Sequence, residues 1–239
     1  SIGWTWGYAE SDAFGNIIEY NHIYNIGRGV LSDMGGIYHL GVAPGTRIRY
    51  NHIHDVMSRG YGGWGIYTDE GSTDVLIESN LVYDTSVSGF HQHFGRRNII
   101  RNNIFAFGRK GQIQITRLEP EQFGLTFEQN IFFADHPVML MPNKHAFDHL
   151  DVIARCMRTD RNLYFTTSTK KPSFGGMSWS AWKRLGNESG GMIADPLFVD
   201  PEKRDFTLDP GSPAVGLGFV PFDSKQAGRR KTSSKRSTT

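Results

Sequence analysis

Short apolar stretches separated by turn residues run along most of the chain, and an asparagine marks the same place in each of them. Six asparagines are followed by an apolar pair or by histidine and an apolar residue: Asn21, Asn51, Asn80, Asn103, Asn130 and Asn162. They are 30, 29, 23, 27 and 32 residues apart. A period of this length is typical of a solenoid, in which each repeat stacks on the previous one and none folds alone.

The residues around each asparagine predict a short β-strand. The predicted strands span residues 17–23, 46–53, 75–82, 99–105 and 125–132. Equivalent residues of neighbouring repeats then lie about 4.8 Å apart, the spacing of hydrogen-bonded strands. The sequence therefore predicts an all-β solenoid, and its period predicts which residues are neighbours.

The repeat is interrupted over residues 135–160, which read as an excursion with a short helix, and then returns. Residues 178–185 predict another short helix, with Ser178 as its N-cap and Gly186 as its stop. Two strands punctuated by prolines follow within residues 194–213. We expect them to cover the open end of the solenoid, where unpaired strand edges invite aggregation.

One domain is predicted over residues 1–223, with its cap near residues 175–223. Because the first residues already read as part of a repeat, we expect N-terminal repeats, and any signal peptide, to be missing. No run approaches the roughly 18 apolar residues of a membrane span. The single Cys156 excludes an internal disulfide.

The net charge of +2 hides a basic C-terminus. Residues 224–239 hold six basic residues and no acid, which leaves 20 basic and 24 acidic residues, a charge of about −4, for the rest. Segments of this Ser/Thr/Lys/Arg composition are usually disordered and solvated. We therefore predict a disordered tail and no binding of nucleic acid.

A second strand in each repeat predicts two columns of side chains. Counted from the asparagines, the inner column is apolar: Ile37, Ile66, Phe90 and Ile113. Side chains alternate across a strand, so the outer face is predicted to carry Tyr38, Tyr67, His91 and Gln114, and two residues further on Leu40, Asp69, His93 and Thr116. Alignment on the preceding glycines shifts the fourth repeat by one. We prefer the asparagine register because it keeps the inner column apolar.

The first two repeats carry five or six extra residues before this strand, around 32–35 and 61–64. Glycine-rich loops held over one face of a rigid scaffold commonly carry function. Glycoside hydrolysis generally needs two carboxyl groups. We expect Asp33 and Asp69 to be these two carboxyl groups, with Glu70 as the substitute. The alternative for Asp33 is that it only forms a turn before the glycines. Retention and inversion of configuration both stay open.

The side chains expected to bind substrate are Tyr38, Trp64, Tyr67, His91 and His93, with Trp64 as a flat face for a sugar ring. A solvated sheet face is the alternative for each residue. His91 and His93 share one face, so a metal pair completed by Asp69 or His39 is also open. We favour hydrogen bonds to sugar hydroxyls and predict no metal.

Three segments carry a family resemblance: residues 32–38, 61–71 and 89–95. They resemble right-handed parallel β-helix proteins of bacterial polysaccharide utilisation, in particular glycoside hydrolase family 141, whose activities include fucosidase and xylanase. The resemblance implies a right-handed parallel β-helix and a secreted or periplasmic enzyme acting on a plant or algal glycan. It also implies that Asp33 and Asp69 are the matching acids.

Three functions follow as hypotheses. The first is a glycoside hydrolase, monomeric and without a cofactor, acting on a polysaccharide or oligosaccharide. The second is a polysaccharide lyase or epimerase, with Tyr67, His91 or Lys110 as the proton acceptor and calcium as its cofactor. The third is a non-catalytic glycan-binding solenoid. The two-carboxylate hypothesis requires that the acids lie within about 10 Å of each other at a cleft.

Overall fold

The computed structural model describes residues 1–143 and 150–229, and its main feature is three parallel sheets to which successive repeats each contribute strands. The first sheet has the order β1 (Ile17–Glu19), β4 (Arg47–Arg49), β8 (Leu76–Glu78), β12 (Asn98–Arg101), β15 (Leu125–Glu128) and β18 (Met157–Asp160). The second has the order β2 (His22–Ile26), β5 (His52–Val56), β9 (Leu81–Thr85), β13 (Ile104–Gly108), β16 (Ile131–Ala134), β19 (Leu163–Thr166) and β22 (Met192–Ile193).

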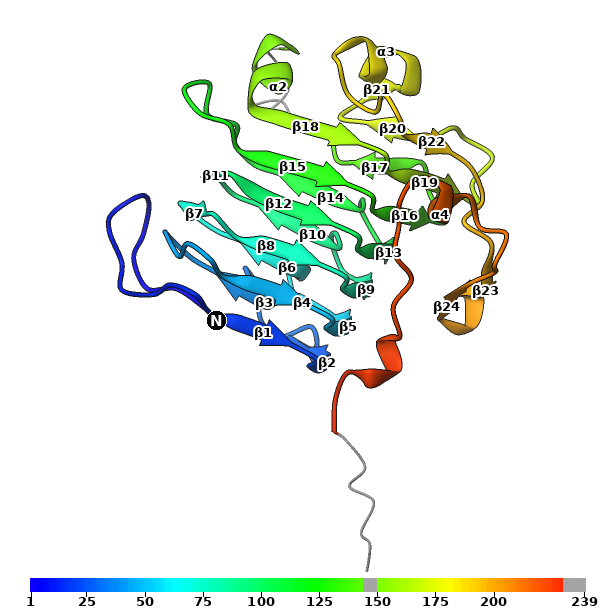
Figure 1. Cartoon of the computed structure of the whole chain (residues 1–239). Helices are drawn as coiled ribbons and strands as arrows, with labels where there is room; N and C mark the ends of the chain where they lie inside the picture. The colour runs from blue at the N-terminus through cyan, green and yellow to red at the C-terminus, as the bar shows by residue number, and fades with distance from the viewer. Residues whose placement is uncertain (144–149, 230–239) are drawn as a thin grey trace, which may run out of the picture.

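The third sheet carries the second strand of each repeat. From the first repeat onward it holds β3 (Gly35–His39), β6 (Trp64–Thr68), β10 (Phe90–Gln92), β14 (Ile113–Ile115), β17 (Val138–Leu140), β20 (Ser173–Phe174) and, antiparallel at its edge, β21 (Met177–Ser178). β7 (Ser72–Thr73) and β11 (Gly95–Arg96) form a small parallel pair. In Figure 1 the repeats follow one another from blue β1 and β2 at the lower end to yellow strands at the upper end. The predicted all-β class is confirmed.

The predicted register of the third sheet is confirmed. Ile37 pairs with Ile66, Ile66 with Phe90, and Phe90 with Ile113, while Tyr38, Tyr67, His91 and Gln114 pair in the same way. The four apolar residues are at most 5% exposed and belong to the main core. The alternative alignment on the glycines is therefore wrong.

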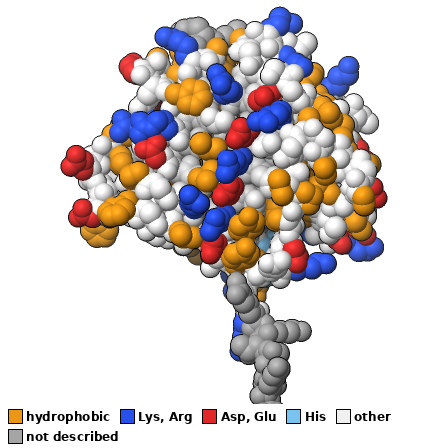
Figure 2. Space-filling model, viewed as in Figure 1, with side chains coloured by type: hydrophobic (Ala, Val, Ile, Leu, Met, Phe, Trp, Pro, Cys, Tyr) orange, Lys and Arg blue, Asp and Glu red, His pale blue; other side chains and the backbone are white. Residues whose placement is uncertain are grey.

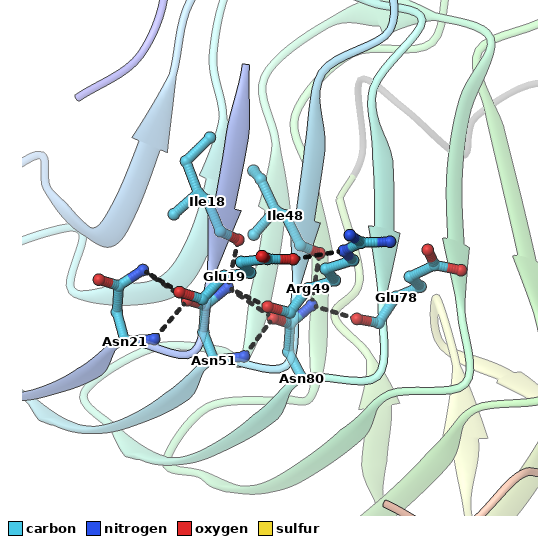
Figure 3. Close-up of polar contacts among 8 residues, drawn as sticks. All are labelled: Ile18, Glu19, Asn21, Ile48, Arg49, Asn51, Glu78 and Asn80. Atoms are coloured by element: carbon cyan, nitrogen blue, oxygen red, sulfur yellow. Dashed lines mark hydrogen bonds and ion pairs between the residues drawn. The ribbon is translucent and has the colours of Figure 1, made fainter. Parts of the chain in front are cut away.

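The asparagines form a continuous hydrogen-bonded ladder, part of which is drawn in Figure 3. Each Nδ2 from Asn21 to Asn130 donates to Oδ1 of the next ladder asparagine at 2.9 to 3.0 Å. The same Oδ1 atoms accept the backbone N–H of the preceding ladder asparagine. The ladder ends on a carboxylate, since Asn162 Nδ2 lies 2.7 Å from Glu188 Oε1.

The ladder provides hydrogen-bond partners for the backbone at a sharp bend between the first and second sheets. The residue before each ladder asparagine has left-handed backbone, with φ of 53° to 56°: Tyr20, Tyr50, Ser79, Asn102, Gln129 and Arg161. Such a bend leaves buried carbonyls without strand partners, and buried polar groups must be paired. Asn51 Nδ2 accordingly donates to the carbonyls of Ile18 and Arg49 at 2.9 and 3.0 Å.

Ion pairs between neighbouring repeats cover the outer face of the first sheet. Arg49 pairs with Glu19, Arg101 with Glu78, and Arg161 with Glu128, at 2.8 to 3.3 Å. Figure 2 shows acidic and basic side chains interleaved on this face. Such exposed pairs contribute little to stability individually. None of the described helices is long and apolar enough to cross a membrane.

The repeat continues through much of the predicted excursion, which corrects that expectation. β17 pairs with β14, and β18 pairs with β15. The short helix expected there is α2 (Leu150–Cys156), and residues 144–149 of the excursion lie outside the described part of the chain. The second predicted helix is confirmed as α3 (Trp179–Arg184), capped by Ser178.

From the sequence we expected the C-terminal strands β23 (Phe198–Asp200) and β24 (Asp205–Leu208) to cover the open end of the repeats. They do not. They form a hairpin on the outer face of the second sheet, where Phe198 contacts Phe133 and Phe206 contacts Tyr83 at ring distances of 5.6 and 5.2 Å. That face is apolar and needs cover because it carries Leu81, Ile104 and Ile131. At the end of the repeats it is α3 that adds to the main core, with Trp182 1% exposed.

The chain continues from α4 (Pro213–Gly216) along the second sheet to the first repeat, seen in red in Figure 1. A turn of 3-10 helix spans Ser224–Gln226, and the Gly228 N–H donates to the Tyr20 carbonyl at 2.8 Å. The predicted disordered tail therefore does not begin at residue 224. Residues 230–239 lie outside the described part of the chain.

Candidate functional site

The two inserted loops pack on each other beside the third sheet. The Asp33 N–H donates to the Tyr61 carbonyl at 3.0 Å. Gly62 has φ of +87°, and a Cβ there would lie 2.7 Å from the Asp33 nitrogen. Only glycine fits this close approach without strain. The glycine-rich sequence of the second loop therefore positions Asp33 on the first.

Asp69 follows β6 and is the buried carboxylate of the site, 5% exposed. Its Oδ2 accepts a hydrogen bond from Tyr38 Oη at 2.6 Å, and its Oδ1 lies 3.0 Å from His93 Nδ1. Burial by itself raises the pKa of Asp69, but hydrogen bonds from His93, Tyr38 and Tyr67 outweigh it and lower the pKa to about 2. Asp69 is thus an ionised carboxylate at neutral pH.

His93 connects Asp69 to Glu70. The hydrogen bond with Asp69 is the main cause that raises the pKa of His93, against the lowering effect of burial. Glu70 Oε1 lies 3.6 Å from His93 Nδ1. The His93 side chain is 30% exposed. A partly exposed imidazole with a raised pKa therefore lies between two carboxylates.

Asp33, the exposed acid, shares its surroundings with Asp69. Tyr61 hydrogen-bonds to Asp33, which is the main cause that raises the pKa of Tyr61, and the charge of Asp69 adds to it. Burial and the Asp69 hydrogen bond raise the pKa of Tyr38 above its usual range, with further contributions from the charges of Asp33 and Glu70. All three acids predicted from the sequence therefore lie within electrostatic reach of the Tyr38 hydroxyl.

Trp64, Tyr67 and His91 form a buried aromatic cluster next to these acids. Each is 3% exposed, and the His91 ring lies 4.0 Å from that of Trp64 and 4.6 Å from that of Tyr67. Trp64 Nε1 donates to Gln114 Oε1 at 2.7 Å, and His91 Nε2 lies 2.8 Å from Thr116 Oγ1. This burial corrects the expectation that Trp64 offers a flat face to a sugar ring. Within this cluster Tyr67 is one of the groups that lower the pKa of Asp69.

Exposed aromatic faces come instead from the N-terminal segment and the second loop. Ile2 bonds to the edge of β3, since its N–H donates to the Tyr38 carbonyl at 2.8 Å. A Cβ on Gly71 would lie 1.9 Å from the Gly7 carbonyl oxygen, so the segment also passes next to the turn after Glu70. Within it Trp4 is 86% exposed and Trp6 63%, and Tyr61 is 61% exposed.

A second cluster, which sequence reasoning missed, lies on the outer face of the second sheet. His22 on β2 pairs in register with His52 on β5, and His54 follows two residues later. His22 Nε2 lies 2.8 Å from His54 Nε2, and one ligand atom from each histidine falls within 4.8 Å of the others. The signal was present in the sequence, because His22 and His52 both follow a ladder asparagine.

Two of these histidines, His52 and His22, have lowered pKa values. Burial lowers the pKa of His52 to about 4, and the neighbouring His22 and His54 add to the shift. Burial and His54 also lower the pKa of His22. Neutral imidazoles are the form that binds metal ions.

Comparison of the chain with known protein families, with curated protein sequences and with solved structures gives no significant match. Function is therefore inferred from the geometry and chemistry of the side chains alone.

Proposed function

We propose that the chain is a glycoside hydrolase of the right-handed parallel β-helix type, acting on a plant or algal polysaccharide or oligosaccharide. The observation that carries the proposal is Asp69, a buried carboxylate that accepts a hydrogen bond from Tyr38, interacts with His93 and, like Asp33, acts electrostatically on Tyr38 and Tyr61. Glycosidases need one carboxyl group in the ionised form and one that donates a proton. The low pKa of Asp69 suits the base or nucleophile and is wrong for the acid.

In this proposal Asp33 protonates the leaving oxygen, and Glu70 is its substitute. Asp33 is exposed on the inserted loop, where Tyr61 bonds to it and is exposed for contact with a sugar. His93 orients Asp69 and, with Tyr38, offers polar atoms to the substrate. Tyr67 and His91 are too buried to contact a sugar and act by packing.

The three parallel sheets with successive strands from each repeat support the β-helix part of the proposal. The resemblance to glycoside hydrolase family 141 stays a prediction, as does the location of a monomeric enzyme outside the cell or in the periplasm, where such polysaccharides occur. A lyase mechanism through Tyr67 is disfavoured. Burial and the hydrogen bond with Asp69 raise the Tyr67 pKa far above its usual range, which makes the phenolate that a base needs inaccessible.

The test is a screen of the chain against plant and algal glycans, with release of reducing ends as the readout. On the substrate found, Asp69→Asn and Asp33→Asn should each lower turnover by roughly 10²- to 10⁴-fold, the usual worth of a positioned acid or base. Asp12→Asn is the matched control, because Asp12 is an exposed carboxylate outside the site. Circular dichroism checks that the variants fold.

Two results would overturn the proposal. Full activity in Asp69→Asn would show that Asp69 is not the base or nucleophile. An unsaturated product that absorbs in the ultraviolet shows elimination in place of hydrolysis. Binding of a glycan without turnover by the wild-type chain supports the non-catalytic alternative.

A further inference from the structure

The histidine cluster on the second sheet is built on two neighbouring strands. His22 and His52 are register partners, and His54 lies two residues along the same strand as His52. Residues spaced by two share one face of a strand. All three imidazoles therefore project from the outer face of the first two repeats, where their rings lie 4.6 to 5.1 Å apart.

One histidine is already oriented as metal ligands usually are. His54 Nδ1 lies 2.7 Å from Asp55 Oδ2, so the Nδ1 proton is donated to the carboxylate and the lone pair of Nε2 is directed at His22 Nε2, 2.8 Å away. Metal-bound histidines typically donate their other ring N–H to a carboxylate in this way. Asp55 reaches its neighbour because its backbone is left-handed, with φ of 53°. The bend breaks the alternation that otherwise directs successive side chains to opposite faces.

The spacing of the nitrogens is close to that of a coordination shell. Two nitrogens on one tetrahedral zinc ion lie about 3.3 Å apart, as zinc–nitrogen bonds of about 2.0–2.1 Å require. The Nε2 atoms of His22 and His54 are 2.8 Å apart, and the third ligand atom lies within 4.8 Å of both. Small side-chain rotations bring the three nitrogens around one ion, and for His52 this releases its 3.1 Å contact with Tyr83 Oη.

The surroundings leave a coordination position open. His52 also lines a cavity of about 530 Å³ between the second sheet and the C-terminal segment, which reaches Phe222 and Lys225. The ligand group among the described residues consists of the three histidines, without a fourth protein donor. A fourth position is then available to water or to a ligand entering from the cavity.

We propose that His22, His52 and His54 bind one divalent transition-metal ion, with zinc as the ion that best fits three imidazoles and an open fourth position. Three imidazole nitrogens favour Zn²⁺, Cu²⁺ or Ni²⁺ over the hard ions Ca²⁺ and Mg²⁺, which take oxygen ligands. Asp55 is a positioning residue that holds the His54 ring. The site is separate from the acids of the third sheet and does not depend on their function.

The experiment uses the full chain, freed of metal with chelator and titrated with Zn²⁺ by calorimetry and with Co²⁺ by visible absorption. We expect one ion per chain and the absorption of tetrahedral Co²⁺. His22→Ala should weaken binding at least tenfold, and because His22 is exposed its loss leaves the core intact. Asp55→Asn should keep the stoichiometry and weaken affinity by about 10- to 100-fold, as loss of a carboxylate partner does elsewhere.

His93→Ala is the matched control, since it removes a histidine from the third sheet and should leave zinc binding unchanged. Thermal melts in chelator show whether each variant is folded before metal is added. The proposal is overturned by the absence of Zn²⁺ and Co²⁺ binding in the wild-type chain, by wild-type affinity in His22→Ala, or by loss of binding in His93→Ala.

Discussion

Removal of one interior rung of the asparagine ladder tests what holds the repeats together. Asn80 is completely buried. Its Oδ1 accepts the backbone N–H and the Nδ2 of Asn51 at 3.0 and 2.9 Å. Its Nδ2 donates to the carbonyls of Ile48 and Glu78 and to Asn103 Oδ1, at 2.9 to 3.1 Å. Asn80→Ala deletes all five hydrogen bonds, four of which are fully buried.

The cost follows from those partners. The Asn51 backbone N–H loses its acceptor and the Ile48 carbonyl loses a donor, and a buried group left unsatisfied costs about 1–3 kcal/mol. Asn51 Nδ2 keeps the carbonyls of Ile18 and Arg49 as acceptors. Asn103 Oδ1 keeps the backbone N–H of residue 80 as a donor, so its loss is smaller. We therefore expect Asn80→Ala to lower the free energy of unfolding by about 3–5 kcal/mol, which is a large part of the 5–15 kcal/mol of a typical domain.

Asn21→Ala is the matched comparison at the exposed end of the same ladder. Asn21 donates to Asn51 Oδ1 and the Glu19 carbonyl but accepts no ladder bond, and water can replace what it loses. We expect a cost below about 1 kcal/mol for a loss that water compensates. Denaturant unfolding, followed by circular dichroism and by tryptophan fluorescence, measures both variants and shows whether the repeats unfold together. Equal small effects for the two variants would refute the view that the ladder stabilises the interior.

Four further outcomes are expected. Gly62→Ala should displace the loop that carries Asp33 and lower glycan hydrolysis at least tenfold. Gly60→Ala is the control and should be tolerated, because its Cβ would lie 3.5 Å from Ser32 Oγ. Equal activity of the two variants would contradict this. Asp69, with its pKa lowered to about 2, should contribute about 2 kcal/mol of stability at pH values above its unfolded pKa and lose it as pH falls through about 2. In Asp69→Asn the free energy of unfolding should therefore depend less on pH in the acid range. The buried Glu188 has a raised pKa, so its contribution to stability is complete below its unfolded-state pKa and is lost as pH rises through its folded-state pKa. The free energy of unfolding of Glu188→Gln, measured against pH, should lack this decrease. His93 interacts electrostatically with Asp69, Glu70 and Arg117 and affects the pKa of His91. Its pKa is raised, so it should lose its proton only above its ordinary pKa, and the hydrolysis rate should fall there. This fall at alkaline pH should be absent from the pH–rate profile of His93→Gln.

The register of the sheets could be predicted from the sequence because one residue type serves the same bend in every repeat. The ladder links equivalent asparagines one to one, so counting from them gave the correct partners for Ile37 and Tyr38. The position of Trp64 could not be predicted, because its burial depends on which side chains of later repeats cover it. The same limit applied to the C-terminal hairpin. Its strands were visible in the sequence, but the apolar outer face of the second sheet decided where they pack.

The insertions explain why the candidate acids lie where they do. The ladder requires each repeat to reach the same bend, so the extra residues of the first two repeats cannot be absorbed within the sheets and leave the stack as loops. Asp33 therefore lies on a loop positioned by Gly62 and Tyr61, whereas Asp69 is fixed by β6 and the buried aromatic cluster. Groups held by strands are positioned more precisely than groups on loops. In the proposed enzyme the strand-held Asp69 suits the role that needs an exact approach to the anomeric carbon, and the loop-held Asp33 suits proton donation to leaving groups of different shape.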